Sequence, residues 1–349
     1  MSAFRVALSA DFRKPDGSPS FPEFDLSPLE DHPDIDLFFL EPEPEISAAQ
    51  LADVDALILL TPRVGAASLT PNGRLAMVAR FGVGYDNVDL EACSDHDVAV
   101  VITPDGVRRP VAVSILTLIF ALSGKLFVKD RLARRGPAGW AEKTVHNGVG
   151  LVGLTLGSVG MGNIGAEMFR LARPLDMRFI AYDPYVDPAL AAELGVTLTN
   201  LDTVFRESDF VCVNCPLSDE THHLVDAERL AQMKPTAFLI NTARGPIVDQ
   251  AALTDALRED RIAGAGIDVF EREPPDAEDP LLTLDNAIVT PHALCWTDQL
   301  FAGSGAADVR AVMAVMEGRV PDGIVNRDVV GRPGWTERLA GYARKFGGD

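Results

Sequence analysis

The sequence predicts an α/β protein of two domains, each a doubly wound parallel sheet, with one domain inserted into the other. Short apolar runs of strand length alternate with helical patterns along most of the chain, which is typical of parallel sheets covered by helices. At 349 residues, the chain is also too long for one ordinary hydrophobic core. A glycine-rich turn lies near its middle, with chain left over on both sides. We therefore assign residues 124–297 to an inserted domain, and residues 1–123 and 298–349 to a discontinuous second domain.

The glycine-rich turn has the pattern of a dinucleotide-binding unit. An apolar strand runs into Gly160-Met161-Gly162-Asn163-Ile164-Gly165, and a second strand ends at Asp183. The three glycines permit a tight turn, close approach of a pyrophosphate, and close packing of helix on strand. The helix N-terminus then offers N–H groups to the phosphates. Asp183 is placed to bind a ribose diol and to repel a 2′-phosphate, so the pattern predicts a Rossmann-like domain that binds NAD.

Apolar runs and helical patterns alternate on both sides of this turn. Before it, we expect strands at residues 1–8, 56–60 and 98–101, and one long helix from Pro110 to about Arg135. After Asp183, four more apolar runs predict strands at residues 210–214, 237–241, 264–269 and 287–290. The end of the chain reads as a helix from Gly305 to Glu317 and then a polar tail.

Composition and charge argue against other classes of protein. Of the residues, 47% are hydrophobic and 23% charged, as in globular proteins, and the formal net charge of −20 disfavours nucleic acid as a partner. The longest apolar run, residues 111–122, is shorter than the roughly 20 residues that cross a bilayer. Because no signal peptide is recognisable either, we expect a cytoplasmic protein without a membrane partner. Cys212 and Cys215 form a CxxC inside an apolar strand, which favours a structural role over metal binding or redox chemistry.

Three of the predicted strands lead into side chains that are suited to chemistry. Arg244 follows one strand, Asp268 and Glu273 lie at and after the end of the next, and His292 follows the last. Because ligands of open α/β sheets bind outside the carboxyl ends of the strands, we expect these residues to line one crevice. An arginine can hold a carboxylate, a histidine can transfer a proton, and a glutamate can fix the histidine's tautomer. With a nicotinamide, the set predicts hydride transfer at a carbon next to a carboxylate, although each residue alone would more often be an ordinary loop residue.

These motifs resemble the D-isomer-specific 2-hydroxyacid dehydrogenase family, which includes phosphoglycerate, glycerate and D-lactate dehydrogenases. The resemblance extends from about residue 51 to 297. The motifs that carry it are Arg80-Phe81-Gly82-Val83-Gly84-Tyr85-Asp86-Asn87-Val88-Asp89, the glycine fingerprint, Cys215-Pro216-Leu217 with Thr221, Asn241-Thr242-Ala243-Arg244-Gly245, Asp268-Val269-Phe270-Glu271-Arg272-Glu273-Pro274 and Thr290-Pro291-His292.

The resemblance implies a role for each matching position. Arg244 would bind the substrate carboxylate, His292 would be the general acid and base, and Glu273 would tune His292. The backbone N–H groups of Val83 and Gly84 would also hold the carboxylate. The positions that would touch NAD, besides the three fingerprint glycines, are Asn163, Ile164, Asp183, Cys215, Pro216, Thr221, Thr242 and Asp268. The family further implies a homodimer formed largely through the cofactor domains.

Two segments depart from that family's pattern. Arg108-Arg109-Pro110 precedes Val111-Ala112-Val113 where members commonly carry Val-Ala-Glu, and residues 293–297 replace a small, glycine-rich stretch. Arg108, with Arg109, could bind a second anionic group of the substrate or be a solvated basic pair. Trp296 could line the substrate pocket or pack at a domain interface. His222 and His223 have no acidic or cysteine partner at suitable spacing, so we expect no metal site.

Two alternative functions share these motifs. A non-catalytic protein that senses NAD(H) can have the same fold and retain the three polar residues. A phosphite-type dehydrogenase would use the same three residue types in its site. The sequence favours the hydroxyacid dehydrogenase but does not name its substrate.

Overall fold

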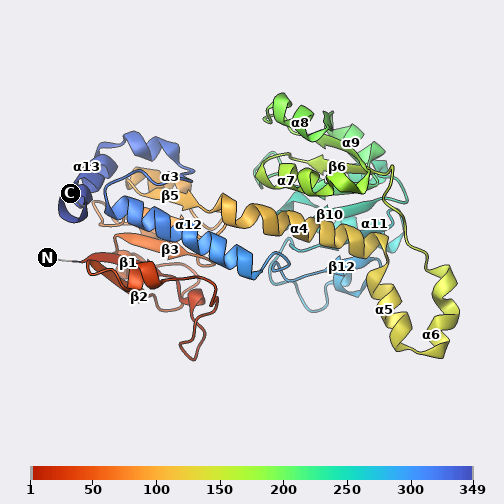
Figure 1. Cartoon of the computed structure of the whole chain (residues 1–349), viewed down its shortest axis with the longest axis horizontal. Helices are drawn as coiled ribbons and strands as arrows, with labels where there is room; N and C mark the ends of the chain where they lie inside the picture. Colours follow the sequence, from red (N-terminus) through yellow and green to blue (C-terminus); the bar gives the residue numbers. More distant parts are fainter. Residues whose placement is uncertain (1–2, 348–349) are drawn as a thin grey trace. The chain divides into compact units, whose positions relative to one another are not determined.

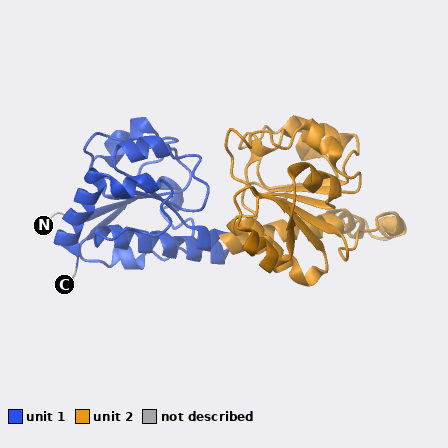
Figure 2. Cartoon of the chain, turned by 90° about the horizontal axis from the view of Figure 1, so that it is seen from above, with its two compact units in different colours: residues 1–107, 296–349 blue, residues 108–295 orange. Residues whose placement is uncertain are grey.

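A computed structural model describes residues 3–347 of the chain, which form two compact units (Figure 2). Unit 1 comprises residues 1–107 and 296–349, and unit 2 comprises residues 108–295. Each unit is built on a parallel sheet with helices, so the predicted α/β class and doubly wound architecture are confirmed.

The sheet of unit 1 has five parallel strands in the order β2-β1-β3-β4-β5. Strand β4 ends at Arg80 and leads directly into the glycine-bearing loop that contains Val83 and Gly84. Strands β2 and β4 were not predicted: β2 mixes apolar residues with Asp36, and β4 ends in the charged Arg80. The strands are β1 (Phe4–Leu8), β2 (Ile35–Phe39), β3 (Ala56–Leu59), β4 (Met77–Arg80) and β5 (Ala99–Ile102).

The helices of unit 1 include the C-terminal part of the chain. They are α1 (Ser27–Glu30), α2 (Ala48–Leu51), α3 (Leu90–Asp95), α12 (Asp298–Met316) and α13 (Pro333–Phe346). Our prediction of a polar tail was wrong. Trp335 of α13 is 1% exposed and donates a hydrogen bond from its indole N–H to the carbonyl of Ala76 at 3.0 Å, so tertiary packing makes this segment a helix of the core.

The sheet of unit 2 has seven parallel strands in the order β12-β11-β10-β9-β6-β7-β8. The order reverses between β6 and β9, which is where ligands of doubly wound sheets bind. The four strands expected after Asp183 are present with slightly shorter bounds, and β8 was missed. The strands are β6 (Thr155–Val159), β7 (Arg178–Tyr182), β8 (Val196–Leu198), β9 (Phe210–Val213), β10 (Phe238–Asn241), β11 (Gly264–Ile267) and β12 (Ala287–Val289).

Helices cover this second sheet, and two of them extend away from it (Figure 1). The helices that follow the strands are α7 (Asn163–Ala172), α8 (Pro188–Leu194), α9 (Leu201–Glu207), α10 (Ala227–Gln232) and α11 (Gln250–Arg258). The extending pair, α5 (Leu126–Arg134) and α6 (Pro137–Glu142), follows the long helix α4 (Pro104–Ser123).

The single helix expected from Pro110 to Arg135 is in fact two helices. Helix α4 begins six residues earlier, at Pro104, and continues through Pro110. It ends at Ser123, because Lys125 adopts the left-handed conformation with φ of 50° before α5 begins. The prediction was wrong because a proline inside a helix resembles a helix start, and a single glycine at residue 124 is a weak signal for a break.

Most of α4 belongs to unit 2, although we had assigned residues 1–123 to the other domain. The side chain of Leu118 packs on Gly266 of β11, where an added Cβ would lie 3.0 Å from the Leu118 Cβ. By length and composition, α4 is the one helix within residues 3–347 that could span a bilayer. However, 72% of its most apolar window is buried inside the protein, as in a core helix.

Candidate active site

The glycine fingerprint forms the turn between β6 and α7. Gly160 has a φ of 93°, and a Cβ there would lie 2.7 Å from backbone atoms of Asn214 and Cys215, so only glycine fits. Asn163, Ile164 and Gly165 form the first turn of α7. The predicted strand–turn–helix unit is therefore present.

Two polar side chains that we did not predict brace this turn. Ser158 donates a hydrogen bond from its hydroxyl to the carbonyl of Gly160 at 2.6 Å, and the Asn214 side-chain amide donates to the Ser158 hydroxyl at 2.8 Å. Ser158 is the next-to-last residue of β6 and Asn214 directly follows the apolar strand β9, so a polar residue at the end of each apolar run is the sequence signal that could have revealed them. They join the ends of β6 and β9 at the point where the strand order reverses.

Asp183 lies at the end of β7 and faces the fingerprint. One carboxylate oxygen accepts a hydrogen bond from the N–H of Met161 at 2.7 Å, and the other accepts from Tyr185 and Val186 at 2.8 and 3.1 Å. Asp183, Gly162 and Asn163 line a pocket of about 300 Å³. The acidic residue and the turn thus form one site, as the sequence predicted.

The residues of this site fit a dinucleotide. Gly162 is the N-cap of α7, and a Cβ there would meet no atom within 4 Å beyond its chain neighbours, so open space lies over the N-terminus of the helix. Thr242 follows β10, and its buried hydroxyl has no hydrogen-bond partner among the described residues. A buried polar atom without a partner is costly and indicates a missing ligand contact.

The part of α4 that belongs to unit 2 begins with Arg108 and Arg109. Arg108 lines the fingerprint pocket, whereas the sequence left open a substrate contact or a solvated basic pair. Arg109 forms an ion pair with the buried Glu167 of α7, with Nε 2.6 Å from Oε1. The pair therefore packs against the cofactor helix, an arrangement that spacing alone could not reveal.

Cys215, Pro216 and Thr221 belong to the loop after β9. The Thr221 hydroxyl donates to the carbonyl of Pro216 at 2.7 Å and accepts from the N–H of Ser218 at 2.7 Å, which closes the loop on itself. Burial raises the pKa of the Cys215 thiol to about 11, so it is a neutral thiol and no nucleophile.

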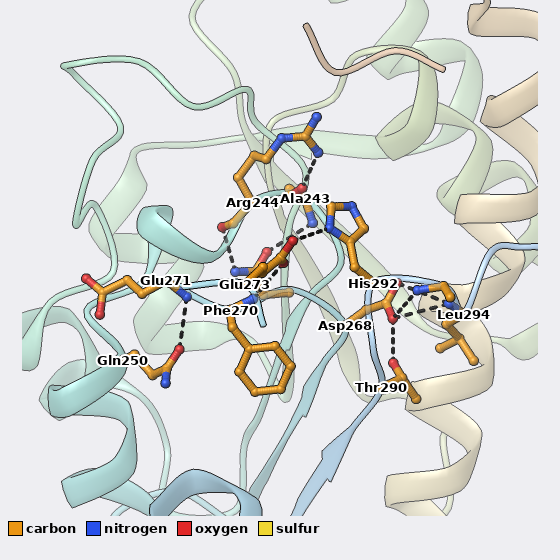
Figure 3. A network of polar contacts seen from close by, with 12 residues as sticks. Ala243, Arg244, Gln250, Asp268, Phe270, Glu271, Glu273, Thr290, His292 and Leu294 are labelled. Carbon is orange, nitrogen blue, oxygen red and sulfur yellow. Dashed lines mark hydrogen bonds and ion pairs between the residues drawn. The ribbon is translucent and has the colours of Figure 1, made fainter. Parts of the chain in front are cut away.

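Arg244, Glu273 and His292 come together after three neighbouring strands, β10, β11 and β12 (Figure 3). The His292 Nδ1 atom lies 2.7 Å from Oε2 of Glu273, whose Oε1 accepts a hydrogen bond from the N–H of Phe270 at 3.0 Å. Arg244 donates from Nη1 to the carbonyl of Ala243 at 2.7 Å. Burial raises the pKa of Glu273, but the hydrogen bond and charge of His292, the Phe270 N–H and the Arg244 charge together lower it below its usual value. Glu273 is therefore a carboxylate at neutral pH.

Asp268 holds the turn that presents His292. Its carboxylate accepts hydrogen bonds from the Thr290 hydroxyl at 2.6 Å and from the N–H groups of Ala293 and Leu294 at 3.1 and 3.2 Å (Figure 3). The N–H of His292 donates to the Asp268 carbonyl at 2.8 Å, and His292 has a left-handed φ of 53°. We expected Asp268 only as a cofactor contact, and the structure adds this positioning role.

His222 and His223 lie in the loop that contains Thr221. Their rings stack with centroids 4.1 Å apart, and His223 forms a short contact with Glu271. Within residues 3–347, no group of three or more His, Cys, Asp or Glu side chains is arranged to hold a metal ion.

Val83, Gly84 and Trp296 belong to unit 1 and are described within it. The loop after β4 is anchored where the N–H of Gly82 donates to the Thr103 hydroxyl at 2.9 Å. Trp296 packs edge-to-face on Phe21 and Phe301, with centroids 5.5 and 5.6 Å away, and remains 48% exposed. Its packing partners therefore lie in its own unit.

The chain is similar to known proteins over most of its length. Residues 116–293 match the family model of the D-isomer specific 2-hydroxyacid dehydrogenase, NAD binding domain. Glyoxylate reductases of Korarchaeum cryptofilum and Thermococcus onnurineus are 37% and 38% identical to the chain. The two alignments cover 88% and 90% of this chain and 94% and 96% of the relatives.

A solved structure shows the same relationship in three dimensions. A glyoxylate reductase from Paecilomyes thermophila has a TM-score of 0.78 at 26% identity, over 93% of this chain and 99% of that one. The family match covers the fingerprint, Arg244, Glu273 and His292, and so joins the two parts of the site in one cofactor-dependent enzyme. The chain therefore belongs to the D-isomer-specific 2-hydroxyacid dehydrogenase family and is an NAD-dependent dehydrogenase that acts on a CH–OH donor.

Proposed function

We propose that the enzyme interconverts a small 2-keto acid and its D-2-hydroxy acid, with glyoxylate as the first substrate to test. The observation that carries the proposal is the His292–Glu273 hydrogen bond of 2.7 Å beside Arg244. The named activity of the relatives at 37% and 38% identity supports glyoxylate in particular.

Each of the three residues has one chemical task in this proposal. When bound, the nicotinamide accepts or supplies the hydride. Arg244 binds the substrate carboxylate through its planar guanidinium. Because Nδ1 of His292 faces Glu273, Nε2 is left to donate a proton to the keto oxygen during reduction and to accept it during oxidation. Following the family, the N–H groups of Val83 and Gly84 also bind the carboxylate.

NAD is the expected cofactor, rather than NADP. The Asp183 carboxylate lies in the fingerprint pocket, where its charge disfavours a 2′-phosphate. Replacement of Asp183 by alanine should weaken NADH binding and reduce discrimination against NADPH. If the preference between the two cofactors stayed the same, Asp183 would have no part in choosing between them.

A substrate panel tests the activity directly. NADH absorbance would be followed with glyoxylate, hydroxypyruvate, pyruvate, phenylpyruvate and phosphorylated 2-keto acids. We expect turnover of at least one, fastest with a small acid, and a D product from any keto acid of three or more carbons. An L product would exclude the stereochemistry proposed, and silence with every acid would exclude the reaction.

We also propose that the protein is a homodimer that uses the segment from α4 to residue 152. This part of unit 2 carries many large apolar side chains that are exposed in the single chain, which is unusual on a free surface. They are Val113, Phe120, Leu126, Phe127, Trp140, Val145, Val149 and Val152. Light scattering should give the mass of a dimer, and Trp140→Asp should produce a monomer; a wild-type monomer at micromolar concentration would exclude the dimer.

A further inference from the structure

Two arginines line the fingerprint pocket, and the family resemblance gave neither of them a cofactor role. Arg108 comes from α4 and Arg170 from the third turn of α7, and they share the pocket with Gly162, Asn163 and Asp183. Arg108 is the first residue of unit 2, so it reaches the pocket from the point where the chain enters this unit. All five residues belong to the same unit.

A buried carboxylate fixes the start of this part of α4 to the cofactor helix. Glu167 of α7 is 3% exposed, and its two oxygens lie 2.6 Å from Nε of Arg109 and 2.6 Å from Nη1 of Arg170. Loss of the arginine partners would leave a buried, unpaired carboxylate and would strongly destabilise the folded protein, so we expect these contacts to persist. The ion pairs thus hold the neighbour of Arg108 against α7 and restrict where Arg108 can lie.

Arg108 and Arg170 bring guanidinium groups to this pocket, beside the carboxylate of Asp183, in a chain whose formal net charge is −20. Asp183 already accepts three backbone hydrogen bonds that orient its carboxylate. Guanidinium groups beside a helix N-terminus suit a ligand that brings phosphate groups.

We propose that Arg108 binds the pyrophosphate of the dinucleotide, and that the Arg109–Glu167–Arg170 ion pairs position it. A guanidinium would add a charged, two-pronged contact to the N–H groups at the N-terminus of α7. The pyrophosphate is favoured over a 2′-phosphate because Gly162 and Asn163 line the same pocket, and because the Asp183 charge repels a phosphate on the ribose. The inference rests on the cofactor site of the proposed function but not on the substrate assigned to it.

Binding without turnover tests this directly. Dissociation constants would be measured by calorimetry for ADP, adenosine and adenosine 2′-monophosphate, and by fluorescence for NADH, with no keto acid present. Arg108→Ala should weaken the binding of ADP and NADH by about 10- to 100-fold, the usual effect of losing one charged hydrogen bond. The dissociation constant for adenosine should stay unchanged. Arg108→Lys should restore part of the affinity, whereas Arg108→Gln, which keeps much of the length, should not.

A matched control and a positioning variant complete the set. Arg173 is an exposed arginine just after α7 that does not line the pocket, so Arg173→Ala should leave all four constants unchanged. Arg109→Ala should weaken the binding of ADP several-fold, and the ratio of the dissociation constants for NADH and ADP should stay the same. Circular dichroism and the melting temperature would confirm that each variant is folded.

Three outcomes would overturn the proposal. Unchanged ADP binding in both Arg108→Ala and Arg108→Gln would exclude any phosphate contact. Loss confined to adenosine 2′-monophosphate would assign Arg108 to a 2′-phosphate. A higher KM for the keto acid with unchanged ADP and NADH constants would return Arg108 to the substrate. The dissociation constants for ADP and NADH do not depend on catalysis. If the wild-type enzyme turned over no keto acid but bound ADP through Arg108, only the proposed substrate would be refuted.

Discussion

The Nδ1 atom of His292 lies 2.7 Å from Oε2 of Glu273, although 18 residues separate the two in the chain. Parallel strands β11 and β12 end side by side, which brings the loops after them together. A carboxylate that accepts Nδ1–H fixes the tautomer and the orientation of the imidazole. The pair is therefore suited to donate a proton from Nε2 and to take it back.

His292 is the residue on which turnover should depend most. Replacement by asparagine removes the proton donor, and we expect kcat to fall by about 10²–10⁴-fold, the usual contribution of general acid catalysis. The dissociation constant for NADH, measured by fluorescence, should change less than about twofold. Substantial remaining turnover would assign the proton transfer to another group.

Glu273→Gln should change the pH profile as well as the rate. The wild-type carboxylate stays ionised at neutral pH because its pKa is lowered, and it accepts the hydrogen bond from Nδ1 of His292. A neutral amide gives His292 no charged partner, so kcat should fall about 10- to 100-fold, and the loss of activity at low pH that comes from protonation of Glu273 should be absent. Glu271→Gln is the matched control, since Glu271 contacts His223 instead. Identical pH profiles for Glu273→Gln and the wild type would contradict the assigned role.

Asp268→Asn should weaken the turn that carries His292. The variant replaces a buried carboxylate, whose Oδ1 accepts from Thr290, Ala293 and Leu294, by a neutral amide that puts an NH2 donor where Oδ2 faces the N–H of Leu294. We expect about 1–3 kcal/mol lower stability of unit 2 in urea unfolding and a clear loss of kcat. Thr290→Val removes only one of these hydrogen bonds and should have a smaller effect. Equal losses in the two variants would show that the backbone N–H contacts contribute little.

Asp308 of α12 should limit stability at neutral pH. Burial raises its pKa well above the usual value, with Arg80 acting in the opposite direction, and neither carboxylate oxygen has a hydrogen-bond partner among residues 3–347. A carboxyl whose pKa is raised by folding stabilises the protein below its unfolded pKa, about 3.9, and this stability is lost as the pH rises through the folded pKa.

The matching variant is Asp308→Asn. It should melt at a higher temperature than the wild type at pH 7–8, and the difference should disappear near pH 4. Asp322→Asn, at an exposed aspartate of the same unit, should melt like the wild type at every pH. A lower melting temperature for Asp308→Asn at neutral pH would mean that Arg80 requires the charge.

The sequence by itself determined the class of fold, the cofactor site and the residues of the proposed chemistry. The fingerprint glycines, Asp183, and the side chains after the strands are local signals, because each depends on a short pattern and on the rule that parallel strands end at one edge. Pro110 and Gly124 are weak signals for where a helix begins or ends, since a single proline or glycine is compatible with several conformations.

Only the tertiary structure decided the features that join distant segments. Trp335 makes an apparently polar tail a helix of the core, Asp268 holds the turn of His292, and Arg108 lines the fingerprint pocket. Each depends on a partner far away in the sequence, on burial, or on an ion pair such as Arg109–Glu167. Such contacts follow from packing, which no local pattern of residues specifies.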